Sequence, residues 1–346
     1  MSTFGILGLS ITPPLLGRIS IGNVVEKNGK RLPVKDDQIT ITTQFQVQRK
    51  WIKHPLDEKL RRDTLAKNAG KEPGDPSLDN MDLLNTKLRS IPVKMLFNDP
   101  NLNLRAEHTC FEKNGRPLCK GNGKEARRHD SATGEVTTVP CNPSNCAVGE
   151  QYHCKPYTRL NLQIEGQDDE LGSFMYRTAG WNSLKTLQAK LNYFYGLANG
   201  KLAGLPLELV MRGKSTAQSM GTTFFYLDLV LRTGYTMPKA VKHAREFQQE
   251  WEDAGISRDA FEEMARQGIA NGMFEDSPDE INSVLEEFFP EVSDETAPAA
   301  ETSVDSMRQL LDQENADLGI TAGSTEASDA SILAQLDTPE PEAVES

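Results

Sequence analysis

The stretch Tyr157-Thr-Arg-Leu-Asn-Leu-Gln-Ile-Glu165 decides the fold of this chain. Leu160, Leu162 and Ile164 alternate with polar residues, which is the pattern of a β-strand with one buried face. The turn-forming residues 165–169 follow it, and residues 173–178 make a second strand-like stretch. Because connections this short join antiparallel strands, the sequence predicts an antiparallel sheet at this point.

Further elements are predicted on both sides of this strand pair. They are strands over residues 16–22 and 39–47, a helix over 56–66, a hairpin over 91–97 and 102–111, a helix starting at residue 180, a hairpin over 205–213 and 222–233, and helices between 238 and 289. This order predicts an α+β fold with a mainly antiparallel sheet, an inserted cysteine-rich zinc loop, C-terminal helices and a disordered acidic tail.

All five cysteines of the chain lie between residues 110 and 154, directly before the 157–165 strand. This segment is rich in turn formers and poor in large apolar residues, so it cannot form a core of its own. The spacing C-x21-C-x4-C-x7-C is typical of a four-thiolate zinc site. We predict that zinc stabilises a loop inserted at residues 110–156, with Cys110 or His153 as alternative ligands to the following four: Cys119, Cys141, Cys146 and Cys154.

Three other interpretations of the same cysteines stay open. Disulfides are disfavoured by the odd number of thiols and by an N-terminus unlike a secretory signal. An iron–sulfur cluster also takes four thiolates, and the thiols can simply be unligated. A four-thiolate zinc site is coordinatively closed, so the predicted metal has a structural and not a catalytic role.

Charge is distributed unevenly along the chain. Residues 251–346 contain 25 Asp and Glu against three Arg and Lys, a net charge of −22, whereas residues 1–250 carry +10. After Pro290 the composition shifts to Ala, Glu, Ser, Thr, Asp and Pro, which favours disorder. We therefore predict a core domain over residues 1–235, a helical region over 236–290 and an acidic disordered tail over 291–346.

A basic body joined to an acidic tail is typical of nucleic-acid binding or protein assembly. Basic side chains held by a metal-stabilised loop are candidates for contacts with DNA phosphates, although they can equally serve solubility. The candidates are Lys120, Lys124, Arg127, Arg128 and Lys155.

Other classes of function lack their usual motifs. The sequence has no apolar run long enough to span a membrane. It also has no phosphate-binding loop, dinucleotide fingerprint or nucleophile elbow. A cytoplasmic, non-membrane protein without a small-molecule substrate is the resulting expectation.

Several motifs resemble one known family. They are Gly17-Arg-Ile19, Gly115-Arg-Pro-Leu-Cys-Lys-Gly-Asn-Gly-Lys-Glu-Ala-Arg127, the pairs Pro140-Cys141 and Cys154-Lys155, Phe174-Met-Tyr-Arg-Thr178, Trp181-Asn-Ser183 and Gly204-Leu-Pro-Leu207. Together they are similar to the large recombination directionality factor-like family of phages and integrative elements, over roughly residues 15–235.

This resemblance implies a non-enzymatic accessory protein that binds a serine integrase and turns integration into excision. Whether such a protein also contacts DNA stays open. Two alternatives remain beside it: a single-stranded DNA-binding accessory protein of recombination or replication, and a metal-dependent hydrolase acting on nucleic acid.

Overall fold

The computed structural model describes residues 8–9, 13–27, 30–47, 50–80, 83, 86–112, 117–130, 133–215, 223–274, 281, 284–285 and 287–289. All of them belong to one compact unit, residues 1–295. Its strands are β1 (Gly8–Leu9), β2 (Leu15–Lys27), β3 (Lys30–Val47), β4 (Lys50–Lys53), β5 (Ser90–Lys94), β6 (Leu104–Phe111), β7 (Pro117–Gly121), β8 (Glu125–His129), β9 (Val136–Pro140), β10 (Lys155–Ile164), β11 (Ser173–Thr178), β12 (Leu207–Lys214), β13 (Phe224–Leu231) and β14 (Gly272–Phe274). Its helices are α1 (Pro55–Ala69), the 3-10 helix η1 (Pro76–Asn80), α2 (Pro100–Asn103), α3 (Ala147–Gln151), α4 (Trp181–Leu197), α5 (Met237–Asp253) and α6 (Arg258–Asn271).

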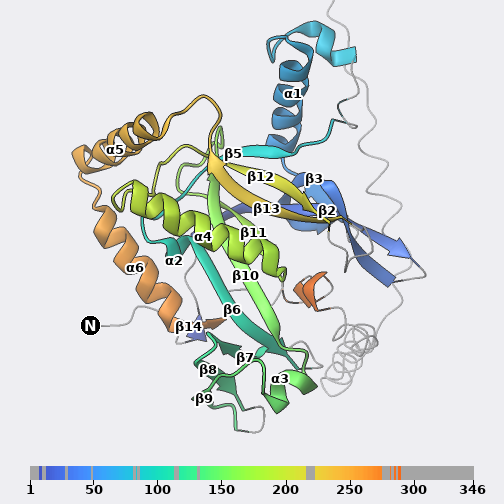
Figure 1. Cartoon of the computed structure of the whole chain (residues 1–346), viewed down its shortest axis with the longest axis vertical. Helices are drawn as coiled ribbons and strands as arrows, with labels where there is room; N and C mark the ends of the chain where they lie inside the picture. The colour runs from blue at the N-terminus through green and yellow to red at the C-terminus, as the bar shows by residue number, and fades with distance from the viewer. Residues whose placement is uncertain are drawn as a thin grey trace, which may run out of the picture. The chain divides into compact units, whose positions relative to one another are not determined.

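Strand β10 lies at the centre of a twelve-stranded sheet within this described part (Figure 1). It pairs antiparallel with both β11 and β6, so Leu160 lies between Tyr176 on one side and Leu104 on the other. The predicted α+β fold with a mainly antiparallel sheet is confirmed. One pair in this sheet departs from it, because β2 runs parallel to β11.

The hairpin predicted from residues 91–97 and 102–111 is wrong. β5 pairs with β12 and with the end of β10, whereas β6 pairs with β10 and β7. The turn-forming residues between them start a helix instead, because Asp99 caps the first turn of α2 and Pro100 occupies its first position. Ile91 and Val93 are then fully buried against the distant strand β12.

The cysteine-rich insertion is more regular than the loop that was predicted. Strands β7, β8 and β9 extend the sheet beyond β6 in successive antiparallel pairs, and the short helix α3 follows them. Figure 1 shows this insertion at the end of the sheet where β6 ends and β10 begins. The backbone hydrogen bonds of the insertion therefore belong to the main sheet.

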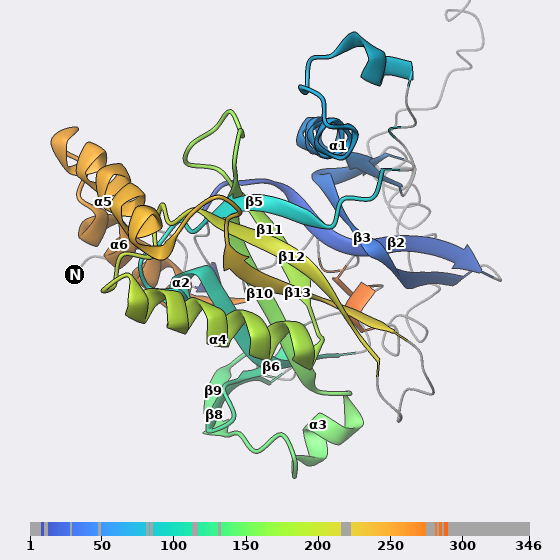
Figure 2. The same cartoon turned by 45° about the horizontal axis from the view of Figure 1, so that its top comes forward.

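The apolar core lies between one face of the sheet and α4, which runs along it (Figure 2). The helix predicted from residue 180 is confirmed. Its residues Leu187 and Leu191 are fully buried, because a spacing of four places them on one side of the helix. Strands β12 and β13 form the second predicted hairpin and pack against the same helix.

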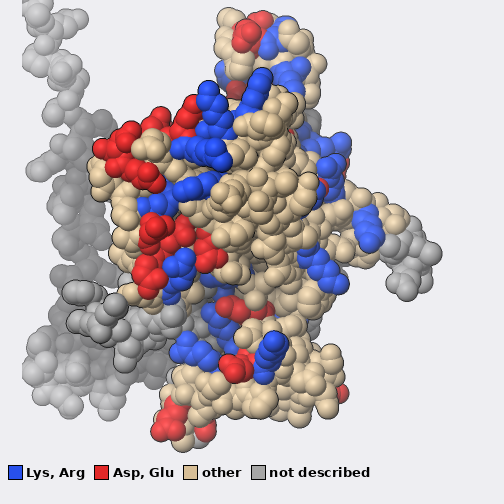
Figure 3. All heavy atoms as spheres, turned by 60° about the vertical axis from the view of Figure 1, so that its left-hand side comes forward, with Lys and Arg blue, Asp and Glu red and all other residues tan. Residues whose placement is uncertain are grey.

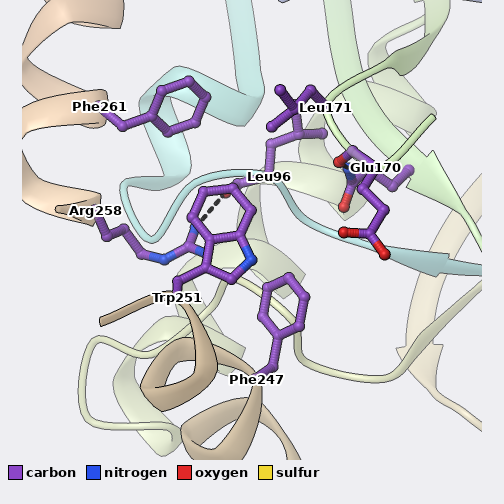
Figure 4. Close-up of a pocket in the computed structure, with 8 residues that line it drawn as sticks. Leu96, Glu170, Leu171, Phe247, Trp251, Arg258 and Phe261 are labelled. Carbon is purple, nitrogen blue, oxygen red and sulfur yellow. Dashed lines mark hydrogen bonds between the residues drawn. The ribbon is translucent and has the colours of Figure 1, made fainter. Parts of the chain in front are cut away.

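Helices α5 and α6 are joined to the sheet through Arg258. Its guanidinium lies 4.3 Å from the Trp251 ring centroid and 5.5 Å from that of Phe247, and Nη1 donates to the Leu96 carbonyl at 2.8 Å (Figure 4). Burial lowers the pKa of Arg258, although cation–π contacts offset part of its desolvation.

The C-terminal predictions are described only in part. Residues 281, 284–285 and 287–288 of the third predicted helix are helical, whereas the predicted tail 291–346 lies outside the described residues. Among the helices that are described, none is long and apolar enough to cross a bilayer.

Substitution of two glycines that have positive φ tests how closely α5 packs against the segment around Gly204. A Cβ at Gly204 (φ +75°) would lie 2.2 Å from Phe247 Cδ1, whereas one at Gly234 (φ +89°) would meet nothing within 4 Å. Gly234→Ala should cost only about 1–2 kcal/mol of backbone strain, and Gly204→Ala should cost about 1–3 kcal/mol more through overpacking. Urea denaturation of both variants measures the difference, and equal losses would show that α5 is not held against Gly204.

Candidate metal centre

The sheet register brings the cysteines of the insertion together. Cys110 on β6 lies directly opposite Cys119 on β7. Cys154 immediately precedes β10, the strand that flanks β6 on its other side, where Lys155 pairs with Thr109. Three thiols that are separated by up to 44 positions therefore meet at one end of the sheet.

The other two cysteines come from the segments that follow β9. The backbone N–H of Cys141 donates to Lys124 at 2.8 Å, and Cys146 caps α3 by accepting from the Gly149 N–H at 3.4 Å. A Cβ at Gly121 would lie 2.6 Å from the Cys141 sulfur, and one at Gly149 would lie 3.2 Å from the Cβ of Cys154. Glycine at these two positions lets the backbone approach the thiols closely.

Cys110 is the hydrogen-bond donor at the centre of the cluster. It is 1% exposed and contacts the thiols of both Cys119 and Cys154. These hydrogen bonds raise the pKa of Cys110 far above its usual range, and they lower the pKa of Cys119 to about 6 and that of Cys154 below its ordinary value. Cys110 carries a single S–H proton, which it donates to one of these two sulfurs at a time.

Arg128 supplies the positive charge of the cluster. It lies opposite Cys119 across β7 and β8, hydrogen-bonds to that thiol, and places Nη2 3.8 Å from the Cys146 sulfur. After the hydrogen bond from Cys110, which is the main cause, this contact also lowers the pKa of Cys119. Arg128 was predicted to contact DNA phosphates, but its side chain is engaged with sulfur.

The structure leaves the zinc prediction unconfirmed. Within the described ranges, no group of three or more His, Cys, Asp or Glu side chains is arranged to hold a metal ion, and all five cysteines are free thiols. The donor chemistry does fit zinc, because buried thiolates with a lowered pKa are its preferred ligands. Of the two alternative ligands, Cys110 hydrogen-bonds with Cys119 and Cys154, whereas His153 is exposed.

The predicted nucleic-acid-binding residues divide between two surfaces. The strand register places Lys120, Arg127 and Lys155 on one face of the sheet and Arg128 on the other. Lys120 pairs with Glu107 at 2.8 Å and Lys155 lies over the Phe289 ring, while Lys124 is exposed in the turn between β7 and β8. Strand alternation places Arg127 on the side of the sheet opposite to Arg128. Sequence reasoning missed the contact of Arg128 with the cysteines because it arises from the pairing of Arg128 with Cys119 across β7 and β8. No local sequence pattern indicates that pairing.

The hydrogen bond from Cys110 predicts a measurable titration in the metal-free protein. Ultraviolet absorbance of thiolate should show one group titrating near pH 6, which is Cys119. Cys110→Ala should move this titration up by more than one pH unit toward an ordinary thiol, about 8.5. The stabilisation that this thiolate gives to the fold is present above the ordinary pKa and is lost as the pH falls through about 6.

Arg128→Gln is the matched variant for this titration. It should raise the pKa of Cys119 by less than Cys110→Ala does, because Arg128 is the weaker cause. An unchanged titration in Cys110→Ala would contradict the proposed donor role of Cys110.

Comparison with known proteins gives one match. The model of the Gp3-like family, described as recombination directionality factor-like, matches residues 16–232, from the start of β2 to the residue after β13. No curated protein and no solved structure matches the chain. Since the match covers more than half of the chain and includes all five cysteines, the protein belongs to the recombination directionality factor-like family, whose members have an accessory role in DNA recombination.

Proposed function

We propose that this protein binds a serine integrase and controls the direction of site-specific recombination. In this proposal it switches the recombinase from joining integration sites to joining excision sites, and it breaks no covalent bond itself. The observation that carries the proposal is the family match over residues 16–232. That region comprises the main sheet, the cysteine-rich insertion and α4.

A change of direction requires selective binding. If two arrangements of the integrase on DNA are in equilibrium, a factor shifts their populations only by binding one more tightly than the other. Moving an equilibrium from 1:99 to 99:1 takes about 5.5 kcal/mol of differential affinity. A rigid contact surface supports such selectivity, because a surface that adapts to both arrangements binds them equally.

We infer that the cysteine-rich insertion forms this surface. Its last strand, β9, pairs with β8 along one edge, and the topology of the described sheet ends at β9. Most residues of β9 are exposed, including Val136 at 43%, and α3 has no buried residue. An exposed strand edge and an uncovered helix are features by which proteins recruit a partner.

We also propose that zinc holds this surface rigid. Cys119, Cys141, Cys146 and Cys154 would be its ligands, with Cys110 as the alternative for one of them. Bound zinc would supply a cross-link between β7, the segment after β9 and the start of β10, and no catalysis. Supporting this are the lowered pKa values of Cys119 and Cys154, which favour the thiolate form that zinc requires.

The hydrolase alternative has less support. Metal-dependent nucleases need carboxylates that converge on one site. The acidic run Asp168, Asp169 and Glu170 instead lies exposed in the turn between β10 and β11. Asp169 accepts hydrogen bonds from the backbone of Leu171 and Gly172, which stabilise the turn. These contacts are typical of a structural role.

The directionality proposal is tested by recombination in vitro. Purified serine integrase from the same mobile element is incubated with either integration or excision substrates, with and without this protein. The protein should stimulate excision by at least about tenfold, which corresponds to about 1.4 kcal/mol, and inhibit integration. No effect on either reaction at stoichiometric concentration would overturn the proposal.

The zinc proposal is tested separately, by elemental analysis. We expect about one zinc per chain, lost in Cys119→Ser and Cys154→Ser. Comparing Cys110→Ser with Cys146→Ser identifies which thiol completes the set. Removal of the metal should lower the Tm by on the order of 10 °C, and metal-free protein with an unchanged Tm would contradict the structural role.

A further inference from the structure

The side of the sheet that faces away from α4 has an unusual composition. On β10, Leu160 and Leu162 point into the apolar core, so Arg159 lies on the opposite face. Register carries this alternation to the neighbouring strands, because Arg105 on β6 and Arg177 on β11 lie directly opposite Arg159. Three arginines therefore stand in one row across three adjacent strands.

The row continues on the flanking strands. Arg18 on β2 pairs with Met175, which shares the face of Arg177. Thr109 pairs with Lys155 on one side and with Lys120 on the other, and Lys120 pairs with Arg127. We name this set the cationic face: Arg18, Arg105, Lys120, Arg127, Lys155, Arg159 and Arg177.

Like charges placed opposite one another destabilise a sheet unless anions accompany them. Glu107 binds Arg159 at 2.7 Å and Lys120 at 2.8 Å, and Glu287 binds Arg18 at 2.5 Å. None of the seven cations is without a partner. Four of the five arginines, all except Arg127, are only 2–6% exposed. Glu107 lies on the sheet itself, whereas Glu287 comes from the C-terminal part of the described chain, so part of the charge on this face is compensated from outside the sheet.

Acidic and aromatic residues near the C-terminal end of the described chain contact this face. Besides the ion pair of Glu287, the Phe289 ring packs 4.7 Å from that of Phe111 and 6.0 Å from that of Tyr157. Lys155 lies 4.7 Å above the same phenylalanine. Residues 275–295 of the sequence contain nine Asp and Glu and no Lys or Arg.

We propose that the cationic face is a binding site for single-stranded nucleic acid, and that Glu287 and Phe289 occupy part of it in the absence of that ligand. Forked guanidinium groups suit phosphate oxygens. Aromatic rings beside a basic groove stack on unpaired bases, and Phe111 and Tyr157 supply such rings here. The carboxylate of Glu287 and the ring of Phe289 resemble the phosphates and bases of a nucleic acid, because each pair combines a negative charge with a flat ring.

On the molecular face drawn in Figure 3, groups of acidic side chains lie next to groups of basic ones. The cationic face, in contrast, has basic residues on six adjacent strands, β2, β11, β10, β6, β7 and β8. The inference does not depend on the integrase partner, since it concerns a different surface from the edge at β9.

The test measures binding of a fluorescent oligothymidylate to the full-length chain by anisotropy. Glu287→Gln removes one of the contacts that occupy the face, so it should tighten binding by roughly tenfold. Adding Arg105→Gln, Arg159→Gln and Arg177→Gln should abolish the gain. It should also reduce the slope of log affinity against log salt by about 2, at about 0.7 for each lost contact.

The matched control removes three exposed basic residues of α5, with Lys239→Gln, Lys242→Gln and Arg245→Gln. This variant loses the same charge and should bind as the parent does. Thermal unfolding checks that the arginine variants fold. Photo-crosslinking of a halogenated oligonucleotide to the unmutated chain gives a second readout that needs no substitution, with Tyr157 as the expected site.

The inference would be overturned if Glu287→Gln did not bind the oligothymidylate, or if the α5 control weakened binding as much as the arginine substitutions do. It would also be overturned if the protein preferred duplex to single-stranded DNA, or if the crosslinks were confined to other surfaces. Binding of an acidic peptide without any binding of oligonucleotide would likewise reject it, in favour of a protein partner for the same face.

Discussion

The antiparallel pairing of β6 with β10 is the constraint on which the rest of the structure depends. It joins segments about 50 residues apart and encloses the whole cysteine-rich insertion between them. Because β7 then pairs with the outer edge of β6, the insertion is an extension of the sheet and not a separate domain. The same pairing places Leu160 in the apolar core and Arg159 on the opposite side. One register thereby sets the position of the thiols, the core and the cationic face.

The two faces of the sheet are stabilised in different ways. The face toward α4 carries apolar side chains, many of them leucines. Their burial contributes about 25 cal/mol per Å² of apolar surface to the free energy of folding. The other face carries arginines beside one another, and burying them is favourable only when their charges are paired. Its ion pairs with Glu107 and Glu287 meet that requirement. The apolar face thus stabilises the fold, whereas the charged face suits a ligand that can exchange with Glu287 and Phe289.

The thiol cluster shows how function and folding are connected in the insertion. Hydrogen bonding with Cys110 lowers the pKa of Cys119 to about 6 and that of Cys154 below its ordinary value, and the positive charge of Arg128 also lowers the pKa of Cys119. Such a cluster is suited to a metal, since neighbouring thiolates repel one another without a cation between them. A rigid insertion is also what selective binding to one integrase arrangement requires. The proposed metal and the proposed partner therefore both require this end of the sheet to be rigid.

Local sequence patterns were enough to predict the strands with clear alternation, the helix from residue 180, the cysteine grouping and the family. Each of these depends on neighbours in the chain: Leu160, Leu162 and Ile164 show period two, and Trp181 to Leu197 shows helical spacing. The tertiary structure alone decided which strands pair. It separated β5 from β6, placed Cys110 beside Cys119, turned Arg128 toward sulfur and aligned Arg105, Arg159 and Arg177 in one row. The reason is physical: alternation fixes which residues share a face of one strand, but the partner and register of that strand come from contacts with distant segments, which no local pattern records.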